Sequence, residues 1–427
     1  MSCRGTTGRE PVTNIFAKLA YNGRLCARHV AEVTDRNSTE RKDMMEKTGK
    51  IAGLLTLASI VVLVTSLVVL PGCKKDSGPQ PKETPVFSLA WSEYPSWSTF
   101  GVAHEVGIIN GKKGAMGPIE KKWGVDIELK EADYDACIVM FGAGQCDASC
   151  LTNMDVLNAT LRRASVGILP TSTSFGADAL LVPNTITDIK QLRGKDVWGL
   201  KKTVSEYCFV RNLEILGEKE TDHRFTNMDP GAAALAFQQK QPGYDAIVVW
   251  NPFVIESLNK RKDSIRLFDS KTIPGEIVDM VQVAQSSLDR PGGKDFACAV
   301  IETFYAICRR LDDPKTRGDT LKALGEKFAN LDRESMEVVV QQTLFYATPE
   351  AGIKLLTGDE WTTPHADAQM DEGLPFKGTM ERVVDFCVSH DIVPSEPSIG
   401  YGVKDAALEV AYRLDPSYIR AYMAGPK

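Results

Sequence analysis

The sequence predicts an α/β protein with two lobes and a helical C-terminal part. Short apolar strand patterns alternate with helical patterns between residues 86 and 285, which is typical of mostly parallel sheets covered by helices. After about residue 295 the spacing of apolar residues becomes helical. The chain has 427 residues, of which 43% are hydrophobic. A chain of this length usually divides into more than one domain, each with its own hydrophobic core.

The individual elements follow from this periodicity, from Gly217 as a helix end and from Pro252 as a first helical residue. Strands are expected at residues 86–91, 125–129, 177–182, 196–200, 246–250 and 277–283. Helices are expected at residues 155–163, 186–192, 205–216, 252–260, 296–311, 316–330, 333–345 and 380–390.

The N-terminal part differs in composition from the rest of the chain. Residues 51–70 form an uncharged apolar run that follows Lys47 and Lys50, an order typical of a secretory signal. Leu70-Pro71-Gly72-Cys73 resembles a bacterial lipobox, in which Cys73 would be lipidated, although Pro71 departs from that motif.

The apolar run is also close to membrane-spanning length, so an uncleaved anchor is the alternative. Both alternatives place the remainder of the chain on the periplasmic side of the inner membrane, tethered to it. We expect residues 1–43 to be a non-native or disordered extension, 44–73 a signal peptide with lipobox or an anchor, and 74–85 a tether.

Charge and cysteine content exclude several function classes. The net charge is -6 and no basic block is present, which argues against a nucleic-acid partner. Seven cysteines follow the leader; Cys146 and Cys150 are the nearest pair for a disulfide, whereas Cys208, Cys298 and Cys308 are expected to be buried free thiols. Without Cys-x-x-Cys or a close His pair, neither a metal nor a cofactor is expected.

Candidate ligand-binding residues gather at strand-to-helix junctions. In α/β folds, ligands bind beyond the carboxyl ends of strands, where helices begin. Aromatic faces combined with carboxylates suit a planar or cationic polar ligand. The expected ligand-binding residues are Trp91, Glu93, Tyr94, Trp97, Asn153, Asp155, Ser205, Tyr207, Trp250, Asn251 and Glu276.

Several of these residues have an alternative role at helix starts. Thr152 and Asp155 have the spacing of a capping box, as do Thr203 and Glu206. Asn251 is a favourable helix cap before Pro252. At these junctions capping and ligand binding both remain open.

Several segments carry a family resemblance: Leu151-Thr152-Asn153-Met154-Asp155, Val248-Val249-Trp250-Asn251-Pro252, Phe268-Asp269-Ser270 followed by Ile273-Pro274-Gly275-Glu276-Ile277-Val278-Asp279-Met280, and the closing stretch from Phe386 to Tyr401. The chain resembles periplasmic solute-binding proteins of the nitrate/sulfonate/taurine class of ABC importers, and most of all the urea-type proteins encoded near urea carboxylase.

The resemblance implies a monomeric, hinge-closing, type II binding-protein fold with two crossover strands, and an ABC permease as partner. It places lobe one at residues 86–180 plus 286–427 and lobe two at residues 181–285. The crossovers would fall near residues 177–182 and 281–287.

The candidate site contains Glu93, Asp155 and Glu276, and the only cations nearby in sequence are Lys201 and Lys202. An oxyanion site should offer cations or many donors, whereas carboxylates accept paired hydrogen bonds from planar N–H groups. We therefore expect the substrate-binding component of an ABC importer, not an enzyme, with a small urea-like or guanidinium-like ligand.

Three alternatives differ from this expectation. One is a nitrate, sulfonate or taurine binder, and another is a tethered sensor domain. The third is an enzyme of the same fold resembling those of thiamine-pyrimidine synthesis, which needs a catalytic His and clustered Cys. Against the enzyme, the four histidines after the leader lie outside the candidate turns: His104, His223, His365 and His390.

Overall fold

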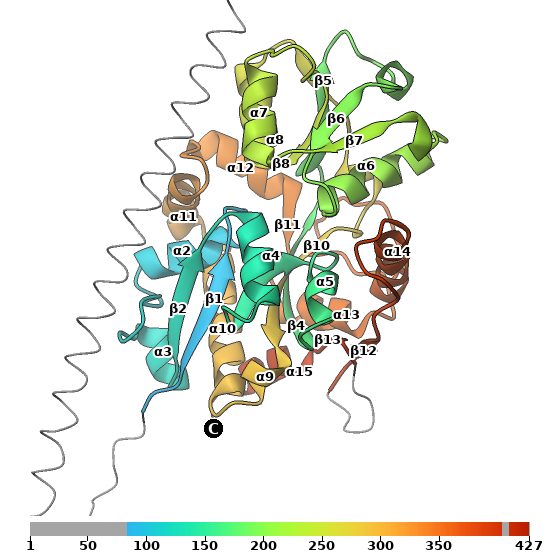
Figure 1. Cartoon of the computed structure of the whole chain (residues 1–427). Coiled ribbons are helices and arrows are strands. Elements are labelled where there is room, and N and C mark those ends of the chain that lie inside the picture. The colour runs from blue at the N-terminus through green and yellow to red at the C-terminus, as the bar shows by residue number, and fades with distance from the viewer. Residues whose placement is uncertain (1–82, 404–409, 427) are drawn as a thin grey trace, which may run out of the picture. The chain divides into compact units, whose positions relative to one another are not determined.

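The computed structural model describes residues 83–403 and 410–426 of the chain. These residues form two sheets, each flanked by helices (Figure 1), and we call the parts built on them lobe one and lobe two. The predicted α/β class is confirmed. Cys73, the signal segment and most of the predicted tether lie outside the described residues. Within those residues, no helix combines the length and apolar character needed to cross a membrane.

Lobe one is built on a mixed sheet of eight strands. Strand β1 runs parallel to β2 and β3, whereas β10 lies between β3 and β4 and runs antiparallel to both. The strand order is β2-β1-β3-β10-β4-β13-β12, and β11 also pairs with β4. The strands are β1 (Val86–Trp91), β2 (Asp126–Glu131), β3 (Ala148–Thr152), β4 (Ser165–Ser174), β10 (Val278–Ala284), β11 (Thr343–Phe345), β12 (Ile399–Tyr401) and β13 (Tyr412–Leu414).

The sheet of lobe two has the order β7-β6-β8-β5-β9, which repeats the arrangement β2-β1-β3-β10-β4 of lobe one. Strand β6 runs parallel to β7 and β8, and β5 lies antiparallel between β8 and β9. In each lobe the antiparallel strand is the one that arrives from the other lobe. The strands are β5 (Asp178–Pro183), β6 (Asp196–Gly199), β7 (Arg224–Asn227), β8 (Ile247–Trp250) and β9 (Ser264–Asp269).

The helices cover the sheets through apolar faces. The longest, α10, has thirteen buried residues and packs against α2, α3, α11 and α15 of lobe one. In lobe one the helices are α2 (Ser98–Glu105), α3 (Pro118–Trp123), α4 (Tyr134–Gly142), α5 (Val156–Thr160), α9 (Gln285–Leu288), α10 (Gly293–Asp312), α11 (Pro314–Lys327), α12 (Arg333–Gln342), α13 (Pro349–Thr357), α14 (Phe376–Ser389) and α15 (Ser417–Ala424). In lobe two they are α6 (Val204–Ile215), α7 (Pro230–Gln238), α8 (Phe253–Lys260) and the 3₁₀ turns η1 (Ile189–Leu192), η2 (Glu220–Asp222) and η3 (Ser270–Thr272).

The lobe boundaries predicted from the resemblance are displaced. Strand β5 already belongs to lobe two from Asp178, and β10 lies inside the sheet of lobe one. The first crossover is therefore residues 175–177 and the second is residues 270–277. The apolar runs that were expected to be crossovers are mostly sheet strands, and the short segments before these strands make the crossing. The hydroxyls of Ser174 and Ser270 lie 2.7 Å apart there.

Two further local predictions are corrected. The helix expected at residues 333–345 ends at Gln342, because Thr343–Phe345 pairs with β4 as a strand instead. All seven described cysteines are free and buried, so Cys146 and Cys150 form no disulfide. The buried free thiols expected at Cys208, Cys298 and Cys308 are confirmed.

Candidate functional site

A small cavity of about 20 Å³ lies where the carboxyl ends of strands from both lobes meet the starts of α2, α4 and α6. We call it the cage. Both lobes and the second crossover contribute side chains to it. Its lining residues are Tyr94, Trp97, Tyr134, Thr152, Asp178, Val204, Trp250, Ile277 and Asp279.

Four aromatic rings form a continuous wall of the cage. The Tyr94 and Trp97 ring centroids are 4.9 Å apart, and Trp97 stacks on Tyr134 at 5.3 Å. Tyr134 in turn meets the Trp250 ring edge-on at 5.7 Å. Three of the rings come from lobe one and Trp250 comes from lobe two, so the wall is complete only when the lobes are together. Clustered ring faces attract cations.

Two carboxylates occupy matching places in the two lobes. Asp178 begins β5 and pairs with Trp250 at the end of β8, while Asp279 lies near the start of β10 and pairs with Thr152 at the end of β3. Each is 2% exposed. Each accepts a hydrogen bond from a serine of β4: Ser174 Oγ lies 2.6 Å from Asp178 and Ser172 Oγ lies 2.5 Å from Asp279.

A third carboxylate, that of Asp155, lies directly behind the cage. Its Oδ2 accepts hydrogen bonds from the Tyr134 hydroxyl at 2.7 Å and from Thr152 Oγ1 at 2.9 Å. Its Oδ1 is buried with no hydrogen-bond partner among the described residues, although the Val204 amide lies close enough to act on the carboxylate. Asp155 is 4% exposed.

Burial dominates the electrostatics of these three acids. It raises the pKa of Asp155 to about 6 and that of Asp178 to about 7, since the hydrogen bonds from hydroxyls only partly offset the loss of water. Burial and the neighbouring Asp178 charge hold the pKa of Asp279 well above its usual range. No Lys, Arg or His lines the cage. The cage therefore concentrates negative charge, or protons in its place, against aromatic faces.

The structure places the residues predicted from the first junction in three environments. Tyr94 and Trp97 line the cage. Trp91 lies in the core instead, where a Cβ added to Gly101 would stand 2.8 Å from its ring. Glu93 lines a larger hollow outside the cage and accepts a hydrogen bond from the Ala329 amide. Trp91 and Glu93 therefore do not line the cage.

Asn153, Tyr207 and Glu276 are buried but do not line the cage; their side chains make hydrogen bonds within the protein. The Asn153 side chain donates to the Glu276 carbonyl at 3.1 Å and accepts from the Val278 amide at 3.0 Å. It thereby fixes the backbone on both sides of Ile277, a lining residue.

The Glu276 carboxylate contacts side chains from two helices, α6 and α14. Tyr207 donates to it at 2.5 Å, Arg211 at 3.0 and 3.1 Å, and Arg382 at 2.6 Å. We call these four residues the Glu276 cluster. Burial alone would raise the pKa of Glu276, but hydrogen bonds from Arg211 and Tyr207 and the charge of Arg382 lower it. Lys201 and Lys202 were the only cations expected near the candidate site, but Arg211 and Arg382, which are distant from Glu276 in sequence, bind its carboxylate.

Of the remaining predicted residues, only Trp250 lines the cage directly. Asn251 donates to Gln342 at 2.8 Å and so joins lobe two to α12. Ser205 is fully buried in the first turn of α6, and its hydroxyl has no hydrogen-bond partner among the described residues. Thr203 caps this helix through the Ser205 amide, so the capping alternative applies there.

The prediction missed Tyr134, Asp178 and Asp279 as site residues. Asp178 and Asp279 stand in otherwise apolar strand runs, Ala177-Asp178-Ala179 and Val278-Asp279-Met280. Burying a carboxylate in an apolar strand costs free energy unless a partner compensates its charge. An Asp inside an apolar run is therefore a local sequence signal that could have identified both residues. Tyr134 opens α4 in a region without a recognisable pattern.

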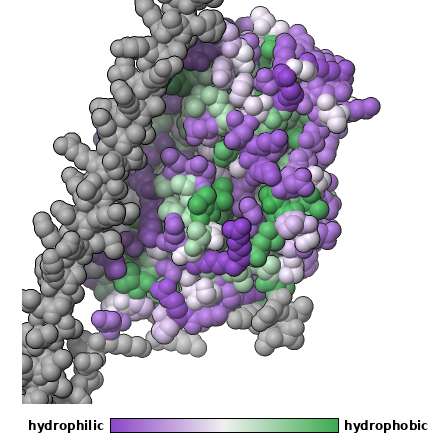
Figure 2. Space-filling model, viewed as in Figure 1, coloured by the Kyte–Doolittle hydropathy of each residue, from purple (hydrophilic) through white to green (hydrophobic). Residues whose placement is uncertain are grey.

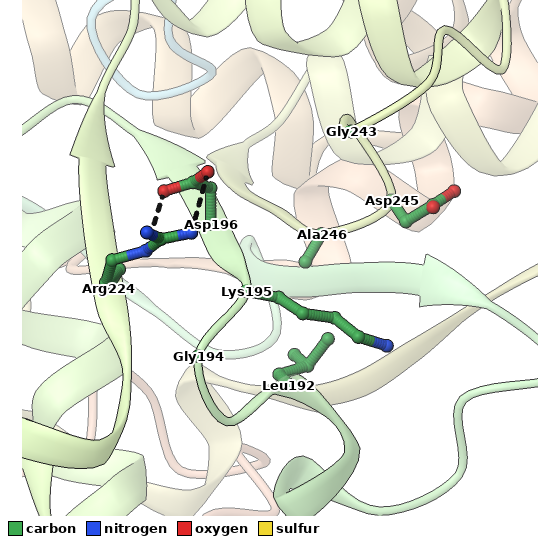
Figure 3. Close-up of a pocket in the computed structure, with 8 residues that line it drawn as sticks. All are labelled: Leu192, Gly194, Lys195, Asp196, Arg224, Gly243, Asp245 and Ala246. Atoms are coloured by element: carbon green, nitrogen blue, oxygen red, sulfur yellow. Dashed lines mark hydrogen bonds and ion pairs between the residues drawn. The ribbon is translucent and has the colours of Figure 1, made fainter.

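Two other hollows are lined by charged side chains. The one outside the cage holds about 590 Å³, shares Tyr134 and Trp250 with it, and is lined by five carboxylates, those of Glu93, Glu131, Asp133, Asp135 and Asp229. Figure 3 shows the other, at the amino ends of the lobe-two strands, where Arg224 turns toward Asp196 while Lys195 extends away from them. This second hollow has no aromatic wall. On the face shown in Figure 2, hydrophobic residues gather only in small separate patches.

Comparisons with known proteins agree with this architecture. No family model and no curated protein matches the chain. Solved structures do match: the periplasmic aliphatic sulphonate binding protein of Escherichia coli has a TM-score of 0.54 and 16% identity, over 74% of this chain and 90% of that one.

Two further solved structures from other organisms also match the chain. The alkanesulfonate-binding protein of Xanthomonas axonopodis pv. citri, bound to MOPS, has a TM-score of 0.55 and 14% identity over 74% and 96% of the two chains. The periplasmic nitrate-binding protein of Synechocystis has a TM-score of 0.53 and 10% identity over 80% and 89%. The fold is that of the periplasmic binding proteins, as predicted.

No group of three or more His, Cys, Asp or Glu side chains within the described residues is arranged to hold a metal ion.

Proposed function

We propose that this chain is the solute-binding component of an ABC importer and that its ligand is a small organic cation of the guanidinium type. It would act on the periplasmic side of the inner membrane, tethered through Cys73 or the apolar segment before it. The observation that carries the proposal is the cage, in which four aromatic rings face Asp178 and Asp279 without any basic side chain. The fold of the structural neighbours supports the carrier role.

The lack of cations in the cage argues against the anions that those neighbours bind. A sulfonate or nitrate would find no basic side chain in the lining, and any carboxylate that is ionised there would repel it in a site with little water. A planar cation with several N–H groups would instead donate to both carboxylates while its faces contact the rings.

Transport would proceed by closure and reopening of the lobes. The ligand contacts lobe one through Tyr94, Trp97 and Asp279 and lobe two through Asp178 and Trp250, so it stabilises the closed arrangement over an open one. No bond is made or broken. The closed form is the one that docks on the permease.

Isothermal titration of the purified full-length protein tests this function. We expect heat and saturable binding with guanidinium chloride, and none with sodium nitrate or taurine at the same ionic strength. Sodium chloride serves as the matched salt control. Tight binding of nitrate or taurine, with no response to guanidinium or methylammonium, would refute the proposal.

Urea is the second candidate, because one observation favours a ligand with an acceptor. The indole N–H of Trp97 is buried and has no hydrogen-bond partner among the described residues, and it would donate to a carbonyl oxygen. The same titration with urea separates the two, since urea carries the carbonyl without the charge.

A further inference from the structure

We propose that the empty cage stores protons on the carboxyl groups of Asp155, Asp178 and Asp279, and that capture of a cation displaces a proton to solvent. This rests on the proposed function and adds a regulation to it: the carrier is an exchanger that gives up a proton for each monocation it takes. The exchanged proton leaves from a carboxylic acid, and the resulting carboxylate becomes the partner of the ligand.

The geometry requires some positive charge in the cage. Two carboxyl groups, those of Asp178 and Asp279, line a cavity that has no basic side chain in its lining, and a third, that of Asp155, bonds to the lining residues Tyr134 and Thr152; each is no more than 4% exposed. Their partners are the hydroxyls of Ser172, Ser174, Tyr134 and Thr152, which carry no compensating charge. Buried carboxylates without a counter-ion take up protons instead of staying ionised.

The groups around these acids reinforce this behaviour. Asp269 adds another negative charge beside Asp178, and burial raises the pKa of every neighbouring phenol and thiol, so these stay neutral near pH 7. The arginines of the nearby Glu276 cluster are already engaged by Glu276. The neutral groups whose pKa values are raised further by the charge of at least one of the three acids are Tyr94, Tyr134, Tyr346, Cys150, Cys208 and Cys387.

The direction of the pH effect follows from linkage. The pKa of Asp155 is raised to about 6 and that of Asp178 to about 7, and a bound cation would lower both again. Capture is therefore opposed below these values, where the protons must be removed, and unopposed above them. Each exchanged proton changes the affinity by about tenfold per pH unit in the range where it is bound.

The test is calorimetric titration of the full-length protein with guanidinium chloride at pH 6.5, in buffers of different ionisation enthalpy such as phosphate, imidazole and Tris. We expect the observed heat to vary with the buffer in the sense of proton release, by about one proton per ligand. A second titration series from pH 5.5 to 8.5 should show affinity that rises and then levels above about pH 7.

Two substitutions sharpen the test. Asp178→Asn and Asp155→Asn should each reduce the number of protons released, whereas Asp263→Asn, on the lobe-two surface beside Lys240, should leave it unchanged. Guanidinium binding with the same heat in every buffer and the same affinity at every pH would overturn the exchange while leaving the proposed function intact. Absence of binding by any cation would overturn both.

Discussion

The cage acids and Glu276 are equally buried and yet have opposite electrostatics. Asp178 and Asp279 are 2% exposed and Glu276 is 5% exposed. Hydroxyls alone bind Asp178 and Asp279, and their pKa values rise, whereas two arginines and a tyrosine bind Glu276 and its pKa falls. Burial alone therefore does not mark a ligand-binding acid in this fold. The difference is the protein counter-ion: where it is absent, a proton or the proposed ligand must supply the missing charge.

The largest expected effect is a loss of guanidinium affinity, which should distinguish the cage acid Asp279 from Glu276. Asp279→Asn removes one charge from the cage without changing its shape, and we expect guanidinium affinity to fall about 100-fold, since a buried charge-assisted hydrogen bond is lost. Glu276→Gln should weaken binding far less, because Glu276 lies outside the lining. Calorimetric titration at pH 8 measures both. Equal losses in the two variants would contradict the distinction.

Stability should respond in opposite directions to the loss of a cage acid and to the loss of Glu276. At pH 8 Glu276→Gln leaves Arg211 and Arg382 facing a neutral amide, and we expect a loss of about 2–4 kcal/mol in the free energy of unfolding. Asp178, whose pKa is about 7, is ionised at this pH, so Asp178→Asn removes an uncompensated buried charge and the ligand-free protein should become more stable, by about 1–3 kcal/mol. Urea denaturation midpoints provide the comparison, and a marked loss of stability in Asp178→Asn would argue against an uncompensated charge there.

The pH dependence of the ligand-free protein follows from both regions. The raised pKa values of Asp155 and Asp178 give stability that is complete at low pH and is lost as the pH rises through about 6 and 7. The lowered pKa of Glu276 gives stability that is present above its unfolded value, near 4.3, and is lost as the pH falls.

A stability maximum between these two ranges is therefore expected, with slopes of up to roughly 1.4 kcal/mol per pH unit for each titrating group. Thermal unfolding at pH 5.5, 6.5 and 8 measures the upper side of the maximum. Asp178→Asn should flatten that side specifically. A wild-type protein that gains stability continuously up to pH 8 would show that the cage acids are not the uncompensated groups described here.

The sequence was sufficient to predict the fold class and most elements near the cage. Continuous apolar runs such as residues 246–250 and helical spacing such as that of α6 are recognisable in the sequence. Strand β4 was not predicted, because Gly167, Pro170 and the serines and threonines around them interrupt its apolar pattern. The lobe boundaries failed for a related reason: an apolar run looks the same whether it crosses between lobes or lies within a sheet.

The candidate site was predictable only where the signal is local. Tyr94, Trp97 and Trp250 stand out as aromatic residues at strand ends, and all three line the cage. The pairing of Glu276 with Arg382 joins residues 106 positions apart, and no local pattern records it. The sequence alone therefore does not distinguish Glu276, which arginines neutralise in the fold, from Asp178 and Asp279, which have no basic partner.

The smallest expected effect concerns the contact of helix α14 with the second crossover. Arg382→Gln removes one partner of Glu276, while Arg211 and Tyr207 remain bound to it. Arg382 is 37% exposed, so water compensates part of the loss, and we expect a cost of only about 0.5–1 kcal/mol.

Because Glu276 precedes Ile277 and Asp279 in the chain, this change should loosen one side of the cage and speed ligand release about twofold to fivefold, which corresponds to the same free energy. Stopped-flow dissociation monitored by tryptophan fluorescence would measure it, with Glu381→Gln as the matched exposed control on the same helix and Arg382→Lys as the conservative rescue. The preference for guanidinium over urea should not change, since no cage charge is altered. A change in that preference would mean that Arg382 acts on the ligand itself, and that the Glu276 cluster and the cage are one electrostatic unit rather than two.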